Sequence, residues 1–358
     1  MHQEIKSNRV SDLRCAVAAS PGNAAHRHLA WNKVVRAADG TVILAYLGGE
    51  RHGGRKGLYI HTSSDDGETF SPARLLWWGD DSYPNLGNAA LGVTPLGSVV
   101  VIAMGHCGQR PNVVSTIRGW RSTDHAQSFS PIDTSRLDGT VRSVFGRIQE
   151  VPGKGLLVLG FNTPDSKGMD ETALWRAYSG DDGLSWSDPK LVTDQSAPMV
   201  EPSVLWTGER LAGIGRHHGK SAGPVFGADE AFYWHIASDD GGESFTAERT
   251  PMVVGRTGAP YMTQANGVLY SVVTDRAART DDGRHAWTFT LWRNERGDAQ
   301  SWEKIDDLLS VYDEKGETKL DFGYPWGVAL SDDEERIYFY LGTARDVSSI
   351  YSFRLRFS

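Results

Sequence analysis

The apolar positions of this chain of 358 residues fall into short runs rather than long periodic stretches. Each run is rich in Val, Ile and Leu and is bounded by Gly, Asp or Pro, which is typical of β-strands. The runs come in pairs on either side of a turn, so each pair predicts a hairpin. Six pairs occur, at residues 31–49, 86–106, 145–162, 200–217, 258–276 and 322–343. The pattern predicts an all-β fold.

A polar pattern recurs between these hairpins. It reads Ser-x-Asp-x-Gly-x-Thr-aromatic in "SSDDGETF" at residues 63–70, and looser copies stand at 122–129, 179–186 and 238–245. A decayed copy ends at Trp302, and the first residues of the four clear copies are 59, 57 and 59 residues apart. A period near 58 residues in an all-β chain favours a propeller in which each repeat forms one sheet. We therefore predict that residues 1–358 form a single domain, a six-bladed β-propeller.

The last repeat lacks the polar box, because the chain ends with the strand-like run "SIYSFRLRFS". We expect the outer strand of that blade to come from residues 9–18, so that the N- and C-terminal strands close the ring within one blade. The boxes are expected in the turns between third and outer strands. There Asp65 caps backbone N–H groups of its own turn, Gly67 supplies an unusual backbone angle and Phe70 packs between sheets.

Composition narrows the function classes. The formal charge of −8 argues against a nucleic-acid partner, which would need a basic surface. No apolar stretch approaches 18 residues, so no membrane span is predicted. The first twenty residues carry charges where a signal peptide needs apolar residues. This favours a cytoplasmic protein, or a secreted or periplasmic one whose leader is absent from the sequence.

Candidate site residues follow from the repeat, because inner-strand starts and second-strand ends converge around the axis of a propeller. These positions are rich in charged and aromatic side chains, which suggests a site for a polar, anionic ligand. The inner-strand starts are Trp31, Asn88, Arg147, Glu201, Pro260 and Tyr324; the second-strand ends are Glu50, Arg51, His52, His106, Asn162, Arg216, His217, Arg276 and Arg345.

The boxes and the six-hairpin framework resemble the Asp boxes and the six-bladed propeller of the sialidase-like superfamily, over nearly the whole chain. In "VEPSVLWTGERLAGIGRHHG", Glu201 and Arg216 match the Glu that opens and the Arg that closes the family's fourth hairpin. Arg276 in "YSVVTDR" matches the Arg of blade five, and Tyr324 in "FGYPWGVAL" matches the Tyr of blade six. The boxes are specific to the architecture but not to the activity.

The resemblance implies an exo-acting glycoside hydrolase that releases a terminal acidic sugar with retention of configuration. Tyr324 would attack the anomeric carbon, Glu201 would take the tyrosine proton, and Arg216 with Arg276 would hold the sugar carboxylate. A neutral hydroxyl suits this role because a carboxylate nucleophile would be repelled by the anionic sugar. The expected partner is a carbohydrate, and no cofactor is expected.

Two positions depart from the family pattern. The family's first Arg has no counterpart in "HLAWNKVV". Arg27, Arg51 or Arg147 would supply the third guanidinium, or His26 and His28 would replace it. The family's acid/base Asp has no counterpart in "GGERHGG", so Glu50 or His52 would protonate the leaving oxygen. These departures leave the identity of the acidic sugar open.

Other interpretations stay open at this point. Trp31 and Trp326 would form a stacking platform for a sugar ring or fill gaps between blades. His106 and His217 would contact the ligand; no histidine has a recognised metal spacing, so no catalytic metal is predicted, and a structural calcium ion stays open. A polysaccharide lyase acting on a uronic acid, with His52 or His106 as the base, is the second enzyme hypothesis. A carbohydrate-binding propeller without catalysis is the third.

Overall fold

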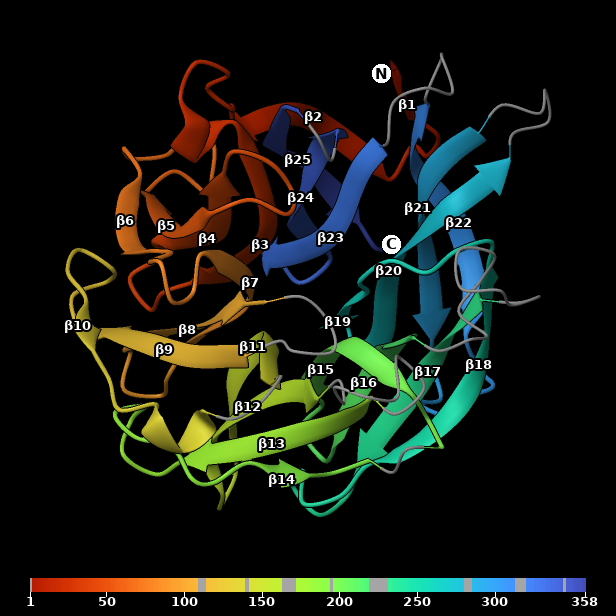
Figure 1. Cartoon of the computed structure of the whole chain (residues 1–358). Helices are drawn as coiled ribbons and strands as arrows, with labels where there is room; N and C mark the ends of the chain where they lie inside the picture. The colour runs from red at the N-terminus through yellow and green to blue at the C-terminus, as the bar shows by residue number, and fades with distance from the viewer. Residues whose placement is uncertain are drawn as a thin grey trace.

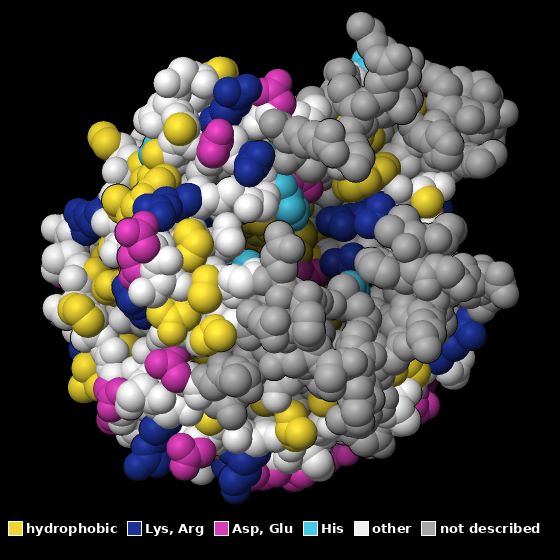
Figure 2. All heavy atoms as spheres, in the orientation of Figure 1, with side chains coloured by type: hydrophobic (Ala, Val, Ile, Leu, Met, Phe, Trp, Pro, Cys, Tyr) yellow, Lys and Arg dark blue, Asp and Glu magenta, His cyan; other side chains and the backbone are white. Residues whose placement is uncertain are grey.

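The predicted all-β fold is confirmed by a computed structural model of the chain. The structure describes residues 2–108, 114–138, 142–162, 172–193, 196–218, 231–279, 285–312, 320–343 and 346–358. These residues form 25 β-strands, two short 3₁₀ helices and no α-helix. Figure 1 shows the sheets following one another around a centre, and Figure 2 shows that the face toward the viewer is hollowed near that centre.

The first half of the chain forms three consecutive groups of four strands, each antiparallel to its neighbour within the group. Their bounds are β3 His28–Arg36, β4 Val42–Gly49, β5 Lys56–Ser63 and β6 Arg74–Trp78; β7 Asn85–Val93, β8 Val99–Cys107, β9 Val114–Ser122 and β10 Ser130–Pro131; β11 Arg142–Val151, β12 Gly155–Asn162, β13 Ala173–Ser179 and β14 Lys190–Leu191. The 3₁₀ helices are η1 Ala24–His26 and η2 Ser135–Leu137.

The second half repeats this organisation. Its strands are β15 Met199–Trp206, β16 Leu211–His217, β17 Ala231–Ser238 and β18 Thr246–Val254; β19 Tyr261–Ala265, β20 Val268–Arg279, β21 His285–Asn294 and β22 Glu303–Tyr312; β23 Leu320–Ala329, β24 Glu334–Thr343 and β25 Ser348–Arg356. The six predicted hairpins therefore correspond to the first two strands of six consecutive groups within the described residues. Their strand middles are buried Val, Ile, Leu and aromatic side chains.

The N-terminal strands join two of these groups: β2 completes the last one, and β1 adds a fifth strand to the group before it. Strand β2, Val10–Val17, pairs antiparallel with β25, with Val10 opposite Leu355 and Cys15 opposite Tyr351. The prediction that residues 9–18 supply the outer strand of the last group is therefore confirmed. Strand β1, His2–Ile5, was not expected and pairs with the edge strand β22. Within the described residues, no helix is long and apolar enough to cross a membrane.

Each polar box forms the turn between the third and fourth strands of its group, as predicted. In the first box, Ser63 Oγ donates to Asp65 Oδ1 at 2.6 Å, and Thr69 Oγ1 donates to Asp65 Oδ2 at 2.6 Å. The backbone N–H of Gly67 donates to Ser63 Oγ at 2.9 Å, and Gly67 has a φ of 77°. Phe70 packs edge-on against Tyr338 of the last group, with ring centroids 5.9 Å apart. The box is thus a self-contained turn that also joins two sheets.

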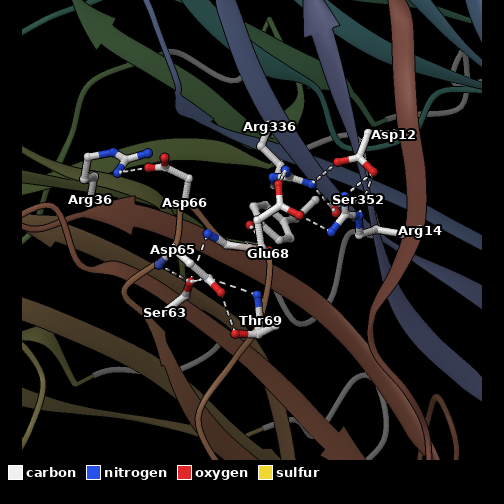
Figure 3. Close-up of polar contacts among 12 residues, drawn as sticks. Asp12, Arg14, Arg36, Ser63, Asp65, Asp66, Glu68, Thr69, Arg336 and Ser352 are labelled. Atoms are coloured by element: carbon white, nitrogen blue, oxygen red, sulfur yellow. Dashed lines mark hydrogen bonds and ion pairs between the residues drawn. The ribbon is translucent and has the colours of Figure 1, made fainter.

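A group of charged residues beside this turn, which we call the rim cluster, consists of Asp12, Arg14, Glu68 and Arg336 (Figure 3). The buried guanidinium of Arg336 in β24 lies 3.0 Å from Asp12 Oδ2 and also contacts Glu68 of the first box. Arg14 of β2 contacts the same two carboxylates. The rim cluster therefore ties the first and last groups to the N-terminal strand.

Candidate active site

The inner strands of five groups share a backbone irregularity that positions the candidate site. The pairing of each inner strand with the next strand shifts register at a residue with positive φ. These residues are Trp31 at 55°, Asn88 at 33°, Gly146 at 95°, Glu201 at 53° and Tyr324 at 55°. A β-bulge re-aims a side chain, and a non-glycine residue in this conformation costs on the order of 1–3 kcal/mol. The bulges therefore identify the positions that the repeat predicted in four groups. In the third group Gly146 takes the place expected for Arg147, and in the fifth, where Pro260 was expected, β19 pairs with β20 without a register shift.

Glu201, Arg216 and Tyr324 form a buried group that we call the axial cluster. Tyr324 of β23 donates its hydroxyl hydrogen bond to Glu201 Oε1, and Arg216 Nη1 of β16 lies 2.8 Å from Glu201 Oε2. All three residues are less than a tenth exposed. The predicted nucleophile and base are thus in direct contact, although they stand 123 residues apart in the chain.

The axial cluster fixes the protonation state of its members. Burial favours the neutral form of Glu201, but the charge of Arg216 and the hydrogen bond from Tyr324 outweigh it and lower the pKa of the carboxyl group. Burial, together with the negative charge of Glu201, raises the pKa of Tyr324 well above its ordinary value. At neutral pH the pair therefore consists of a carboxylate acceptor and a phenol that donates to it.

Two further arginines lie beside the axial cluster. Arg276 passes close to Gly258 and Gly323: a Cβ at these glycines would lie 3.3 Å from its Nε, which is tight, and 3.6 Å from its Nη2, which is an ordinary contact. Arg256 follows β18, and its backbone oxygen accepts a hydrogen bond from the backbone N–H of Arg276 at 2.9 Å. Burial, and then the charges of Arg276 and Arg216, lower the pKa of Arg256 to about 10. Three guanidinium groups therefore gather on one side, and the sequence analysis missed Arg256.

The Nε atoms of Arg256 and Arg276 are buried and have no hydrogen-bond partner among the described residues. A buried N–H without an acceptor costs free energy, so such donors favour an external acceptor. Figure 2 shows basic side chains on one side of the central hollow and histidine side chains around it. The arrangement is suited to a ligand that carries a carboxylate.

A second buried carboxylate, Asp321, organises the opposite side. His52 Nδ1 lies 2.7 Å and His28 Nε2 lies 2.8 Å from Asp321 Oδ2, while the Tyr340 hydroxyl donates to Asp321 Oδ1 at 3.0 Å. Burial alone would raise the pKa of Asp321, but the hydrogen bonds from His28 and His52 outweigh it and lower the pKa far below its ordinary range. We call His28, His52, Asp321 and Tyr340 the histidine cluster; the sequence analysis missed Asp321 and Tyr340.

The histidine cluster is also the one group of described residues whose donor atoms are close enough to hold a metal ion, since its two imidazole nitrogens and the Asp321 oxygen lie within 4.8 Å of one another. The Lys56 amine lies near this carboxylate and donates to the backbone oxygen of Gly54 at 3.1 Å. Both imidazole nitrogens stand at hydrogen-bond distance from one carboxylate oxygen. We therefore interpret the group as a hydrogen-bonded cluster.

Trp31 contacts both the histidine cluster and the axial cluster. Its ring centroid lies 4.6 Å from that of His52 and 6.2 Å from that of Tyr324. The Lys56 amine lies 5.0 Å from the centre of the same ring. Trp326, by contrast, is 2% exposed and packs against Phe145 and Tyr261. Trp31 therefore contacts both clusters, which also meet directly because the ring centroids of Tyr324 and Tyr340 lie 5.6 Å apart, whereas Trp326 fills the interior.

Lys33 lies beneath the axial cluster in an aromatic environment. Its amine is 4.2 Å from the ring centre of Phe145, 4.7 Å from that of Trp326 and 5.7 Å from that of Tyr324. It donates to the backbone oxygen of Asn32 at 3.2 Å. Complete burial lowers the pKa of Lys33 to about 7, although the charge of Glu201 partly offsets that effect. The sequence analysis did not single out this residue.

The structure places the other predicted ligand-binding residues less centrally. Glu50 and Arg51 are exposed in the loop between β4 and β5. Arg147 interacts electrostatically with the buried Glu335, and His217 packs against Phe232 and Trp234 with ring centroids 4.2 Å and 5.7 Å apart.

Of the remaining candidates, His106 is partly buried, and its burial and the nearby charge of Lys56 lower its pKa. Arg27, a candidate for the third guanidinium, pairs instead with Asp346, and Arg345 lies outside the described residues.

Comparison with proteins of known structure finds the same fold in several solved structures, some of which are glycosidases. A protein of unknown function from Dyadobacter fermentans is 18% identical with a TM-score of 0.70, over 98% of this chain and 100% of that one. A Hadza microbial sialidase is 16% identical with a TM-score of 0.67, over 96% of this chain and 68% of that one. An α-L-arabinofuranosidase from Fusarium graminearum is 14% identical with a TM-score of 0.65, over 98% of both chains.

At these identities the likeness shows the fold alone: this chain has a sialidase-like fold. No protein-family model matches the sequence, and no curated protein matches it either. The fold does not determine the substrate, because neighbours with different sugar specificities share it.

Proposed function

We propose that this protein is an exo-acting glycoside hydrolase that removes a terminal acidic sugar with retention of configuration, and that its six strand groups are the blades of one closed propeller. The observation that carries the proposal is the buried contact of Tyr324 with Glu201, supported by Arg216. A phenol paired with an ionised carboxylate is an activated nucleophile. The bulges in β15 and β23 direct both side chains to the same point.

In the first step of the proposed reaction, Tyr324 Oη forms a bond to the anomeric carbon as the glycosidic C–O bond breaks. The phenolic proton passes to Glu201, and a general acid protonates the leaving oxygen. In the second step a water molecule attacks the anomeric carbon, the bond to Tyr324 breaks, and the phenolate recovers its proton from Glu201. Arg216 favours this cycle because its charge keeps Glu201 ionised between turnovers.

The acidic character of the sugar is inferred from the arginines. Arg216, Arg256 and Arg276 place three positive charges beside a nucleophile that is itself neutral, and a carboxylate on the substrate would satisfy the unpaired Nε–H groups of Arg256 and Arg276. Arg256 supplies the third guanidinium that the sequence analysis sought in Arg27, Arg51 or Arg147. A neutral sugar would leave the buried donors of Arg256 and Arg276 unpaired.

His52 is the better of the two acid candidates. The exposed Glu50 belongs to the same loop, but His52 contacts Trp31, which in turn contacts Tyr324. In a retaining enzyme the nucleophile and the general acid flank the glycosidic bond that breaks. The general acid must therefore stand within reach of the leaving oxygen, apart from the nucleophile and its base. We propose His52 for this role.

Release of a fluorescent alcohol from aryl glycosides of sialic acid and of other acidic sugars tests the proposal. We expect turnover of at least one of them, and Tyr324→Phe to remove nearly all of it. Tyr338→Phe is the matched control, because the Tyr338 hydroxyl faces the first box turn, 3.4 Å from the Gly67 oxygen. No release from a broad acidic panel, or full activity in Tyr324→Phe, would overturn the proposal.

A polysaccharide lyase that acts on a uronic acid is the second candidate. The contact of both His52 and Tyr324 with Trp31 favours it, because β-elimination needs a base and an acid near one sugar ring. His52 would abstract the C5 proton, Tyr324 would protonate the leaving oxygen, and the arginines would neutralise the carboxylate. An unsaturated product absorbs ultraviolet light and a hydrolysis product does not, so one spectrum separates the two reactions.

A further inference from the structure

The two ring nitrogens of His52 have different surroundings. Nδ1 is hydrogen-bonded to Asp321, whose side chain is only 6% exposed, whereas the His52 side chain as a whole is 43% exposed. One ring nitrogen is therefore held by a buried anion, and Nε2 is left as the atom that can reach a ligand. The other histidine on the same carboxylate, His28, has a fully buried side chain and cannot make such a contact.

We propose that Asp321 is a positioning residue that holds His52 as the acid/base group of this enzyme, so that a histidine–aspartate pair does the work of a single carboxylic acid. The inference rests on the proposed glycosidase function and deepens it. A histidine–aspartate pair of this kind would replace the acid/base aspartate that the sialidase-like pattern predicts in the loop "GGERHGG" and that this chain lacks there. The carboxylate comes from the start of β23, three residues before Tyr324, and therefore from a different part of the chain.

Asp321 acts through the tautomer and the orientation of the ring. By accepting a hydrogen bond at Nδ1, the carboxylate keeps a proton on that nitrogen, so the second proton is exchanged at Nε2. In the first step, protonated His52 gives the Nε2 proton to the leaving oxygen while the C–O bond breaks. In the second step, neutral His52 takes a proton from the attacking water at the same atom. The protons balance over one turnover, and no other reactant is needed.

The surroundings of Asp321 hold the carboxylate in place. His28 and the Tyr340 hydroxyl occupy its remaining acceptor positions, and Trp31 packs on the ring of His52. Lys56 contacts the backbone oxygen of His52, which fixes the loop. The charged and titratable groups facing His52 are therefore Asp321, His28 and Lys56, and only Asp321 accepts its ring proton.

Leaving-group dependence tests the proposal. A general acid matters for a poor leaving group and hardly for an activated one. We expect His52→Ala to slow hydrolysis of an alkyl glycoside by about 100-fold or more, but that of an activated aryl glycoside by less than about 10-fold. Asp321→Asn should give the same selective loss, and the double variant should be no slower than His52→Ala. Asp346→Asn is the matched control, because this exposed carboxylate pairs with Arg27 and should give no such signature.

An NMR measurement separates this inference from the proposed function. In ¹⁵N-labelled protein, the His52 ring should be the Nδ1–H tautomer when neutral, and Asp321→Asn should abolish that preference. If wild-type protein hydrolyses no glycoside but keeps this tautomer, the proposed function fails and the pairing stands. Asp321→Asn with unchanged leaving-group dependence would overturn the inference. So would a selective loss in Glu50→Gln instead of His52→Ala, or an activity that a chelator removes and zinc restores.

Discussion

The rim cluster and the axial cluster use the same chemistry in different surroundings. Each joins carboxylates to a buried arginine: Glu68 to Arg336 at the rim and Glu201 to Arg216 at the axis. The side chain of Glu68 is 37% exposed and sits in a turn, whereas that of Glu201 is 7% exposed and sits on a bulge with a φ of 53°. The axial carboxylate also accepts from a tyrosine and lies near two further arginines.

The difference shows which feature separates scaffold from site. Carboxylates alone do not: the acidic stretch "SSDDGETF" hydrogen-bonds within its own turn and to the last sheet. A residue with positive φ and a buried guanidinium Nε without a partner also occur at the rim, at Asp12 (φ 54°) and Arg336. The axial cluster is distinguished by the burial of the carboxylate itself, by the shifted pKa of that carboxyl group and by the tyrosine hydroxyl that donates to it. Such features concentrate at functional sites because a fold that needed only stability would not keep them.

The sharpest test of the comparison is the same substitution in both clusters. Glu201→Gln should lower kcat/KM by about 1000-fold or more, because the amide cannot take the tyrosine proton. Glu68→Gln should leave kcat/KM within about twofold and lower the free energy of unfolding by about 1 kcal/mol, since its ion pairs are partly exposed. Kinetics and urea denaturation of both variants measure the two effects. Equal losses of activity would remove the distinction between the clusters.

Replacing Arg336 of the rim cluster should lower the free energy of unfolding. Arg336→Met leaves Asp12 and Glu68 without their buried partner, and we expect the free energy of unfolding to fall by about 3 kcal/mol. The partial exposure of both carboxylates keeps the loss at the lower end of the range for a broken buried pair. Folded Arg336→Met should retain its kcat, and a large fall in kcat at unchanged secondary structure would contradict the assignment.

Lys33 should cost stability in a manner that depends on pH. The pKa of this amine is about 7 in the folded protein and near 10.4 in an unfolded chain. Between these values the unfolded chain binds more protons, so the contribution of Lys33 to stability rises with pH. Lys33→Met should stabilise the protein by at least about 2 kcal/mol at pH 7, and this advantage should shrink toward pH 10. Denaturation of both proteins across this range checks the trend; a constant difference would show that the amine is not desolvated.

The smallest effect is expected in the box turn. Hydrogen bonds from Ser63 and Thr69 lower the pKa of Asp65 to about 2, so its contribution is complete above pH 4 and is lost as pH falls toward 2. Asp65→Ala should lower the free energy of unfolding by about 1 kcal/mol at pH 7, a typical value for a lost capping side chain. The difference from wild type should vanish near pH 2, with kcat unchanged throughout. A persistent difference at pH 2 would assign the effect to packing instead.

The sequence predicted the strand pairs and the box turns because both repeat, and a repeat averages out local ambiguity. It also brought Glu201, Arg216 and Tyr324 together, since inner-strand starts meet at the axis. The sequence pattern assigned Arg147 to the position that Gly146 occupies. The error is one residue, because a bulge inserts an extra residue and the apolar pattern does not show where.

Arg256 and Asp321 were missed for a different reason. Arg256 follows a fourth strand, where the repeat has no fixed register. Asp321 lies on an inner strand, but its partner His52 stands 269 residues away in a loop. No local sequence pattern predicts such a pairing. Strand β1 was missed for a similar reason, because four residues are too few to show the alternation of apolar and polar positions that predicts a strand.

The identity of the nucleophile is the central claim, and covalent trapping tests it most directly. A fluorinated acidic sugar with an activated leaving group should form a glycosyl-enzyme whose breakdown is slow. Peptide mapping by mass spectrometry then locates the sugar. We predict one label per chain, on Tyr324, and none in Tyr324→Phe. A label on Glu201 or on another carboxylate, or turnover of the acidic glycoside without any label on Tyr324, would contradict the account.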